Sequence, residues 1–201
     1  MRYVAEVKKF CADLHSGIRP TTFEEAYALC NHGICGLWEA ELRALWDILQ
    51  REDIQIMAEI GRFKGGALFM FACACPNLKF VRSIDAQPVL GIDEALRTWL
   101  TKNGIHHQIE VNDIRFCYPE MQYDFVFIDG GHRGMIVNRD LENWRERTRL
   151  IGFHDFAYRG RSNAHRCVYP DVVAEVKRAR EAYNWEQVGE RGRSEIVFRV
   201  T

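Results

Sequence analysis

Residues 123–132 read YDFVFIDGGH, and this stretch decides the fold class. From Phe125 to Ile128 the side chains are apolar without a polar interruption, which is typical of a parallel strand covered by helices on both faces. An aspartate and two glycines follow at once, so the strand is expected to end in a turn that carries a carboxylate. We therefore predict a buried strand over residues 123–128.

Segments with the patterns of strands and helices alternate on both sides of this strand. Further strands are predicted over residues 54–60, 79–84, 108–111, 150–153, 185–188 and 196–200. Helices are predicted over residues 67–75, 92–102, 137–144 and 172–183, and the first fifty residues also have helical periodicity. Such alternation is typical of a doubly wound parallel sheet with helices on both faces.

Length and charge narrow the classes of protein. A chain of 201 residues is expected to form one domain, since chains usually divide only near ~250–300 residues. The net charge of -1 offers no basic excess for binding nucleic acid. The longest apolar run, residues 67–75, is far shorter than the ~20 residues that cross a bilayer, and residues 1–15 lack the apolar centre of a secretory signal. We expect a cytoplasmic protein without a nucleic-acid or membrane partner, and a homo-oligomer is left open.

The cysteines agree with a reducing compartment. There are seven, an odd number without a C-x-x-C pair, so no disulfide framework is expected in a chain of this size. Cys30 and Cys35 flank His32, but no second cluster at ligand spacing completes a zinc site. Free thiols are the prediction.

A glycine-rich turn, EIGRFKGG, occupies residues 59–66 between a predicted strand and a predicted helix. Glycines allow a tight turn and a close approach of the backbone to a ligand, and the helix that follows offers free N–H groups to an anion. The spacing is neither G-x-G-x-x-G nor that of a P-loop, which speaks against a dinucleotide or a phosphate cradle. By itself the turn is compatible with a nucleotide-type ligand or with an ordinary connection.

Acidic or histidine residues stand at the ends of five successive predicted strands. They are Glu59, Asp85, Asp113, Asp129 and the pair His154 and Asp155. In open α/β sheets ligands bind at the carboxyl ends of the strands. Because carboxylates gathered along one edge repel one another, this repetition predicts a site for a ligand or a cation.

With SID at 83–85, ND at 112–113 and GFHDF at 152–156, these segments resemble class I S-adenosylmethionine-dependent methyltransferases. More narrowly, they are similar to the small-molecule methyltransferase family that includes the macrocin O-methyltransferase type. The resemblance spans residues 42–173. It implies a Rossmann-like sheet, mostly parallel with an antiparallel C-terminal strand, in which N-terminal helices (1–51) cap a cofactor-binding core (52–201). Ala67 departs from the Ser or Thr frequent in that family.

The resemblance also implies roles for individual residues. It assigns contacts with S-adenosylmethionine to Glu59, Gly61, Gly65, Asp85, Asp113 and Asp129. Within this set, Asp85 would hold the ribose and Asp113 the adenine. Asp129, His154 and Asp155 would bind a divalent metal, and His132 would be the general base. Oxygen ligands suit Mg²⁺, while an imidazole favours Mn²⁺ and its transition-metal neighbours.

We therefore expect metal-assisted O-methylation of a small-molecule hydroxyl. Methylation of nucleic-acid bases is disfavoured, since no Asn/Asp-Pro-Pro-Tyr/Phe segment follows residues 123–128. Residues 158–166 form a basic, turn-rich stretch that is either a lid meeting an anionic acceptor or a solvated loop. Two alternatives stay open: a metal enzyme of the same fold with another reaction, such as hydroxylation, and a cofactor-binding or partner-binding protein without catalysis.

Overall fold

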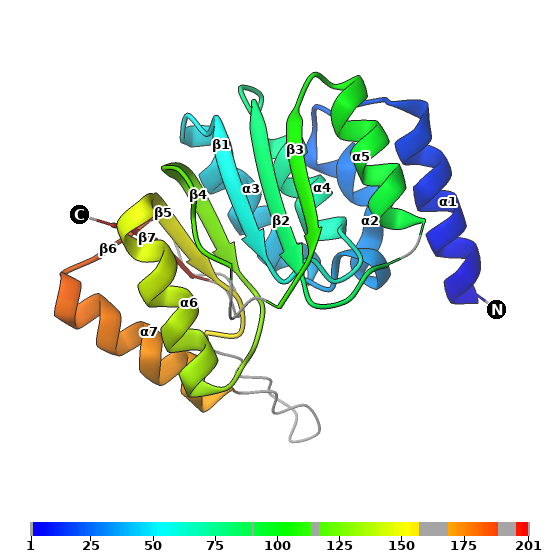
Figure 1. The fold of residues 1–201 in the computed structure, drawn as a ribbon. Helices are drawn as coiled ribbons and strands as arrows, with labels where there is room; N and C mark the ends of the chain where they lie inside the picture. Colours follow the sequence, from blue (N-terminus) through cyan, green and yellow to red (C-terminus); the bar gives the residue numbers. More distant parts are fainter. Residues whose placement is uncertain (1, 90, 114–116, 157–168, 189–195, 201) are drawn as a thin grey trace.

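The computed structural model describes residues 2–89, 91–113, 117–156, 169–188 and 196–200. Its strands form one sheet in the order β3-β2-β1-β4-β5-β7-β6 (Figure 1). The strands are β1 Ile56–Ile60, β2 Phe80–Asp85, β3 His106–Val111, β4 Tyr123–Ile128, β5 Thr148–Phe153, β6 Glu186–Gln187 and β7 Ile196–Arg199. β1 to β5 are mutually parallel, whereas β7 runs antiparallel to both β5 and β6. This confirms the predicted mostly parallel sheet with an antiparallel C-terminal strand.

The helices form two layers around the sheet. They are α1 Arg2–Ser16, α2 Phe23–Cys35, α3 Glu39–Arg51, α4 Gly66–Ala74, α5 Ile92–Lys102, α6 Gly134–Trp144 and α7 Pro170–Tyr183, with a short 3₁₀ turn, η2, at Arg145–Arg147. Figure 1 shows α1 to α5 gathered on one side of the sheet and α6 and α7 on the other. No helix in the described part of the chain is long and apolar enough to span a membrane.

The central strand β4 shows why its sequence is apolar throughout. Phe125 and Phe127 pack into the core shared with α1 to α5, while Val126 and Ile128 pack into the core beneath α6 and α7. Successive side chains of a strand point to opposite faces, so a strand covered on both sides needs apolar residues at every position. The strand predicted over residues 123–128 is confirmed.

Several strand boundaries differ from the predictions, and the starts of β1 and β3 show local reasons. β1 begins at Ile56 and not at residue 54. At the start of the strand, the Asp124 carboxylate accepts the backbone N–H of Gln55 (2.8 Å) and of Ile56 (2.9 Å). β3 begins at His106 and not at residue 108, because His106 pairs with Phe80. β3 is an edge strand with only partial burial, so its first residues need not be apolar. The predicted basic stretch 158–166 lies outside the described residues.

Helix α4 brings the N-terminal helices to the carboxyl edge of the sheet. Every residue of α4 is buried, because α2 and α3 pack against it from outside. Gly66, its first residue, lies so close to α2 that an added Cβ would come within 2.7 Å of the Cys35 backbone. The segment that joins α2 to α3 therefore lies beside the ends of the strands. Cys30 and Cys35 themselves are buried free thiols, as predicted.

Candidate active site

The β1–α4 loop and the β4–α6 loop touch at a position that only glycine can occupy. Gly61 has a φ of +95°, and an added Cβ would stand 2.1 Å from the carbonyl oxygen of Asp129. The Asp129 N–H donates to the Ile60 carbonyl at 2.7 Å, which extends the pairing of β1 with β4 by one residue. The contact places the predicted glycine turn directly against the predicted metal ligand.

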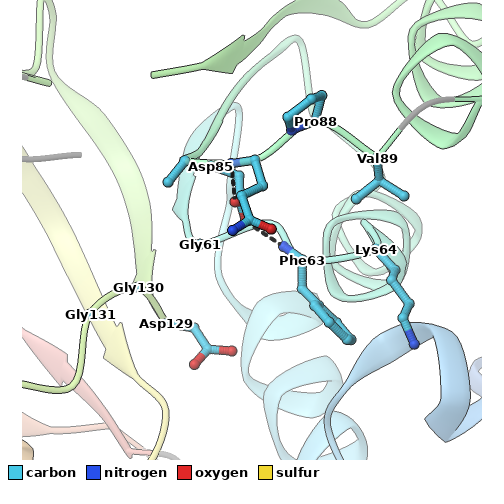
Figure 2. A pocket seen from close by; sticks show the side chains of 11 residues that line it. Gly61, Phe63, Lys64, Asp85, Pro88, Val89, Asp129, Gly130 and Gly131 are labelled. Carbon is cyan, nitrogen blue, oxygen red and sulfur yellow. Dashed lines mark hydrogen bonds between the residues drawn. The ribbon is translucent and has the colours of Figure 1, made fainter. Parts of the chain in front are cut away.

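A cavity of about 490 Å³ opens beside this contact, between the ends of β1, β2 and β4 (Figure 2). Its described lining is Gly61, Phe63, Lys64, Asp85, Ala86, Gln87, Pro88, Val89, Asp129, Gly130 and Gly131. The Asp85 carboxylate accepts the backbone N–H of Phe63 at 2.7 Å and that of Gln87 at 2.9 Å. Asp85 is thus held between two loops at the cavity wall, and its contact with the ribose stays a prediction.

Phe63 was not singled out by sequence reasoning. Its φ is +50°, which is an outlier for a bulky side chain, and its ring is 53% exposed. Backbone strain of this kind concentrates at functional sites. The following residue, Lys64, donates from Nζ to the Gly33 carbonyl at 2.8 Å and so ties the glycine turn to α2. No sequence pattern predicts the positive φ of Phe63 or the hydrogen bond from Lys64 to Gly33.

A second cavity of about 260 Å³ adjoins the first. The two share Gly61, Phe63 and Asp129. The remaining lining of the second is Cys35, Gly36, Arg62, Ala67, His132, His154 and Asp155. The chain therefore presents two neighbouring cavities that share part of their wall.

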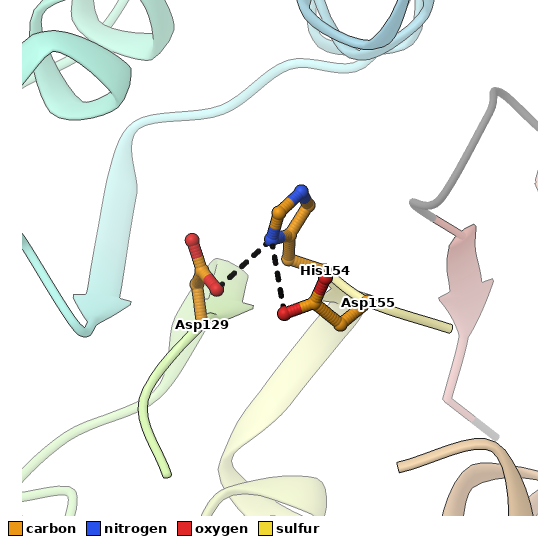
Figure 3. Close-up of side chains that lie close together, drawn as sticks. All are labelled: Asp129, His154 and Asp155. Carbon is orange, nitrogen blue, oxygen red and sulfur yellow. Dashed lines mark hydrogen bonds and ion pairs between the residues drawn. The ribbon is translucent and has the colours of Figure 1, made fainter. Parts of the chain in front are cut away.

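Side chains from the ends of β4 and β5 converge at the second cavity (Figure 3). His154 Nδ1 donates to Asp129 Oδ1 at 3.1 Å and lies 3.5 Å from Asp155 Oδ2. One ligand atom from each of these three residues lies within 4.8 Å of the others. Asp155 has a φ of +58°, a left-handed conformation that Asp tolerates better than most residues. The structure thus brings together the three residues predicted to bind a metal.

His132 lies over the same cluster. Its ring stacks on Tyr169 with centroids 4.0 Å apart. Nε2 is 3.0 Å from Asp155 Oδ2 and 3.8 Å from Asp129 Oδ1. Despite these distances, Nε2 is buried and has no partner with hydrogen-bond geometry. The contact with the carboxylates is electrostatic, and it leaves this nitrogen available to another group.

Charge is concentrated in this cluster and shifts its protonation. The interactions with Asp129 and then Asp155 raise the pKa of His132 to about 9, against a smaller effect of burial. Burial alone would lower the pKa of His154, but the hydrogen bond to Asp129 and the approach of Asp155 and Glu41 raise it far above its usual range. Burial would raise the pKa of Asp155, yet the two imidazoles hold it well below its ordinary value. Two carboxylates are thus balanced by two imidazolium groups.

The cluster fits a divalent cation on two grounds. Two carboxylates and an imidazole are the donor set that Mg²⁺ or Mn²⁺ accepts in proteins. One ligand atom from each of the three residues lies within 4.8 Å of the others, close enough to converge on one ion. Asp129, Asp155 and His154 would hold the cation.

The other predicted cofactor residues lie away from the described lining of the large cavity. Glu59 is 1% exposed and accepts a hydrogen bond from the Ser83 hydroxyl at 2.8 Å. Burial raises the pKa of Glu59 to about 8, against that hydrogen bond and the charge of Arg62. Gly65 is the N-cap of α4, with Leu96 2.3 Å from where its Cβ would stand. Asp113 follows β3 and adjoins residues outside the described part. Direct contacts of these three with the cofactor stay predictions.

The part of the chain that forms the two cavities also matches a known protein family. Residues 58–156 match the family described as methyltransferase domain. No curated protein matches the chain. The stretch that matches the family contains the glycine turn and both cavities' carboxylates, from Glu59 to Asp155.

Solved structures share the fold at low identity. A candidate caffeoyl-CoA O-methyltransferase from Staphylococcus aureus aligns with a TM-score of 0.66 at 14% identity, over 96% of this chain and 99% of that one. An O-methyltransferase from Bacillus cereus in complex with S-adenosylhomocysteine (SAH) gives 0.56 at 16%, over 92% of each chain. An SAH-bound methyltransferase from Podospora anserina gives 0.64 at 11%, over 89% and 86%. At these identities the likeness shows the fold, and the macrocin-type resemblance stays a prediction. Residues 58–156 therefore match a methyltransferase domain, and the chain has the fold of solved methyltransferases, one of them in complex with SAH.

Proposed function

We propose that the chain transfers a methyl group from S-adenosylmethionine to a hydroxyl of a small molecule, with a divalent cation held by Asp129, His154 and Asp155. The observation that carries the proposal is the position of His132. Its Nε2 is buried without a hydrogen-bond partner, in a cavity that adjoins the larger one. A base is needed where an acceptor cavity adjoins a cofactor cavity, because a hydroxyl is a poor nucleophile until it loses its proton.

The large cavity is proposed to hold the cofactor. S-adenosylmethionine supplies an electrophilic methyl group on a sulfonium sulfur. Asp85 would accept the ribose hydroxyls, since its carboxylate is already oriented by Phe63 and Gln87 at the cavity wall. The family match and the neighbours described with bound SAH support this assignment.

The cation cluster is proposed to prepare the acceptor. A bound divalent cation would lower the pKa of an acceptor hydroxyl. The negative charges of Asp129 and Asp155 raise the pKa of the His132 imidazole to about 9. Once the two carboxylates neutralise a cation, less of their charge acts on His132, and its Nε2 can accept the hydroxyl proton near neutral pH.

The size and lining of the second cavity favour a small acceptor. Its volume is about 260 Å³, and its wall includes Gly36, which has no side chain, and the small side chains of Ala67 and Cys35. The exposed Phe63 ring offers an apolar surface to the body of the acceptor. An O-methyltransferase assignment also agrees with the names of the S. aureus and B. cereus neighbours.

The test measures SAH release from S-adenosylmethionine with Mg²⁺ or Mn²⁺ present. Caffeoyl-CoA, named for the S. aureus neighbour, and a panel of small phenols and alcohols serve as acceptors. His132→Ala is expected to lower turnover by ~10²–10⁴-fold, the usual contribution of a positioned base, with SAH affinity unchanged. His106→Ala, an exposed histidine on the edge strand β3, is the matched control.

Three results would contradict parts of the proposal. Full turnover after exhaustive chelation would remove the cation. Turnover of His132→Ala equal to that of the wild type would remove the base. Tight SAH binding with no turnover of any acceptor would favour a binding protein without catalysis.

A further inference from the structure

We infer that Glu41, which comes from α3, is a positioning residue that orients His154 for the cation site. The inference rests on the cation site of the proposed function and adds a carboxylate from the N-terminal helices to it. Glu41 lines neither cavity. It would act through His154 and not on the acceptor or the cofactor.

Glu41 is buried more deeply than its local role requires. It is the third residue of α3, and its Oε2 accepts the backbone N–H of Trp38 at 2.7 Å, which caps the start of the helix. A cap needs only an oxygen, and such residues usually stand at the surface. The Glu41 side chain is 0% exposed, so its charge is removed from water. A buried carboxylate is costly unless a cationic group faces it.

His154 is the cationic group that faces Glu41. Its Nε2 lies 3.7 Å from Glu41 Oε2, within the range of an ion pair. Its Nδ1 points the other way, 3.1 Å from Asp129 Oδ1 and 3.5 Å from Asp155 Oδ2 (Figure 3). The two nitrogens of one ring are therefore directed to different carboxylates on opposite sides.

This arrangement is the one expected of a histidine that binds a metal through Nδ1. Such a histidine almost always gives its other ring N–H to a carboxylate or a carbonyl, which fixes the tautomer and the ring orientation. With the Nε2 N–H facing Glu41 at ion-pair distance, Nδ1 would be left to bind a cation together with Asp129 and Asp155. Glu41 would keep the ring from turning and would strengthen Nδ1 as a donor.

The consequence concerns the N-terminal helices as a whole. α3 does more than cover the acceptor cavity, because it supplies the outer carboxylate of the site. Cys35 and Gly36, at the end of α2, already line the second cavity. The cation site is complete only when β4, β5 and α3 are assembled together.

The test compares Glu41→Gln with Glu39→Gln in the full chain. Gln at position 41 keeps an oxygen for the Trp38 N–H and nearly the same volume, but it removes the charge. Glu39 stands in the same helical turn, is largely exposed and pairs with Arg43, which makes it the matched control. Mn²⁺ binding is measured by calorimetry. We expect Glu41→Gln to weaken Mn²⁺ by about 10–100-fold, the usual effect of losing an outer carboxylate, and Glu39→Gln to leave it unchanged.

A second readout separates positioning from mere support of the fold. Nitrogen NMR of His154 with Mg²⁺ bound is expected to show the proton on Nε2 in the wild type and a mixture of tautomers in Glu41→Gln. Glu41→Asp, which keeps the charge on a shorter side chain, should recover part of the Mn²⁺ affinity. If Glu41→Gln fails to fold, the comparison of Glu41→Asp with the wild type carries the test.

The failures of the two proposals are distinguishable. If Glu41→Gln binds Mn²⁺ like the wild type while His154→Ala binds it weakly, the role of Glu41 is overturned and the cation site stands. If the wild type binds SAH but no divalent cation, both the cation site and the role of Glu41 are overturned, and the methyltransferase assignment stands.

Discussion

The cofactor side and the cation side of the site are built in different ways. The cofactor side, at the ends of β1 and β2, depends on the backbone of one loop and on Asp85, which two backbone N–H groups hold. The cation side, at the ends of β4 and β5, depends on side chains that come from three separate elements and pair with one another. One region is specified by consecutive residues, and the other exists only after the strands and α3 are in place.

The largest expected effect comes from the one position at which the two sides touch. Gly61→Ala would place a Cβ 2.1 Å from the Asp129 carbonyl oxygen and force an alanine to a φ of +95°. Overpacking and left-handed backbone together should lower the free energy of unfolding by about 2–5 kcal/mol, measured by chemical denaturation. We expect SAH and Mn²⁺ affinity to fall together.

Gly104→Ala is the matched control for that substitution. Gly104 also has a positive φ, +70°, but an added Cβ there meets nothing within 4 Å. Its cost should be limited to about 1–2 kcal/mol of backbone strain. Equal losses at the two glycines would mean that the contact between the two loops contributes nothing.

The next effect should be confined to the cofactor side. Asp85→Ala removes the carboxylate proposed to hold the ribose, and charged hydrogen bonds contribute about 1.5–3 kcal/mol each without being additive. We expect SAH to bind about 2–4 kcal/mol more weakly by calorimetry, with Mn²⁺ affinity retained. Asp53→Ala, an exposed aspartate at the opposite end of the strands, should change neither. Unchanged SAH affinity in Asp85→Ala would remove Asp85 from the cofactor site.

The reciprocal effect should be confined to the cation side. Asp155→Asn keeps the shape of the side chain, and asparagine tolerates the φ of +58° at this position. Loss of a direct ligand should exceed the effect of losing an outer one, so we expect Mn²⁺ affinity to fall by at least about 100-fold, with SAH affinity retained. Activity should return in part at high Mn²⁺ concentration. If Asp155→Asn lost SAH affinity as well as Mn²⁺ affinity, the cofactor side and the cation side would not be independent.

Sequence reasoning succeeded where a local pattern, or the shared edge of neighbouring parallel strands, determines the structure. The apolar run in β4 predicted a strand covered on both faces. The glycines of residues 59–66 predicted a tight turn that lets the backbone approach a ligand, and the structure shows Gly61 packed against the Asp129 backbone, while the ligand contact stays a prediction. The convergence of Asp129 with His154 and Asp155 was predicted from strand ends, because parallel strands present those ends at one edge. β4 and β5 are neighbours, with Ile128 opposite Phe153, which is what brings residues 129 and 154 together.

Sequence reasoning missed residues whose role depends on burial or on distant neighbours. Glu41 occupies the sequence position of an ordinary helix-capping glutamate, and only the tertiary packing of α3, which lies against α4, places it beside His154. The burial of Glu59 and its hydrogen bond from the Ser83 hydroxyl were not foreseen, and its contact with the cofactor stays a prediction. Phe63 reads as an unremarkable loop residue until its positive φ and exposure are known.

The sequence by itself determined the alternation of strands and helices, the glycine at the closest contact and the residue types that reach the sheet edge. These follow from local rules: apolar periodicity selects the elements, and positive φ at a crowded turn selects glycine. Only the tertiary structure decided which nitrogen of His154 faces Glu41, that Nε2 of His132 approaches Asp155 without hydrogen-bond geometry, and that Phe63 lines two cavities. The orientation, burial and charge of these side chains depend on neighbours that are far apart in the chain. They are fixed only once packing has removed the groups from water.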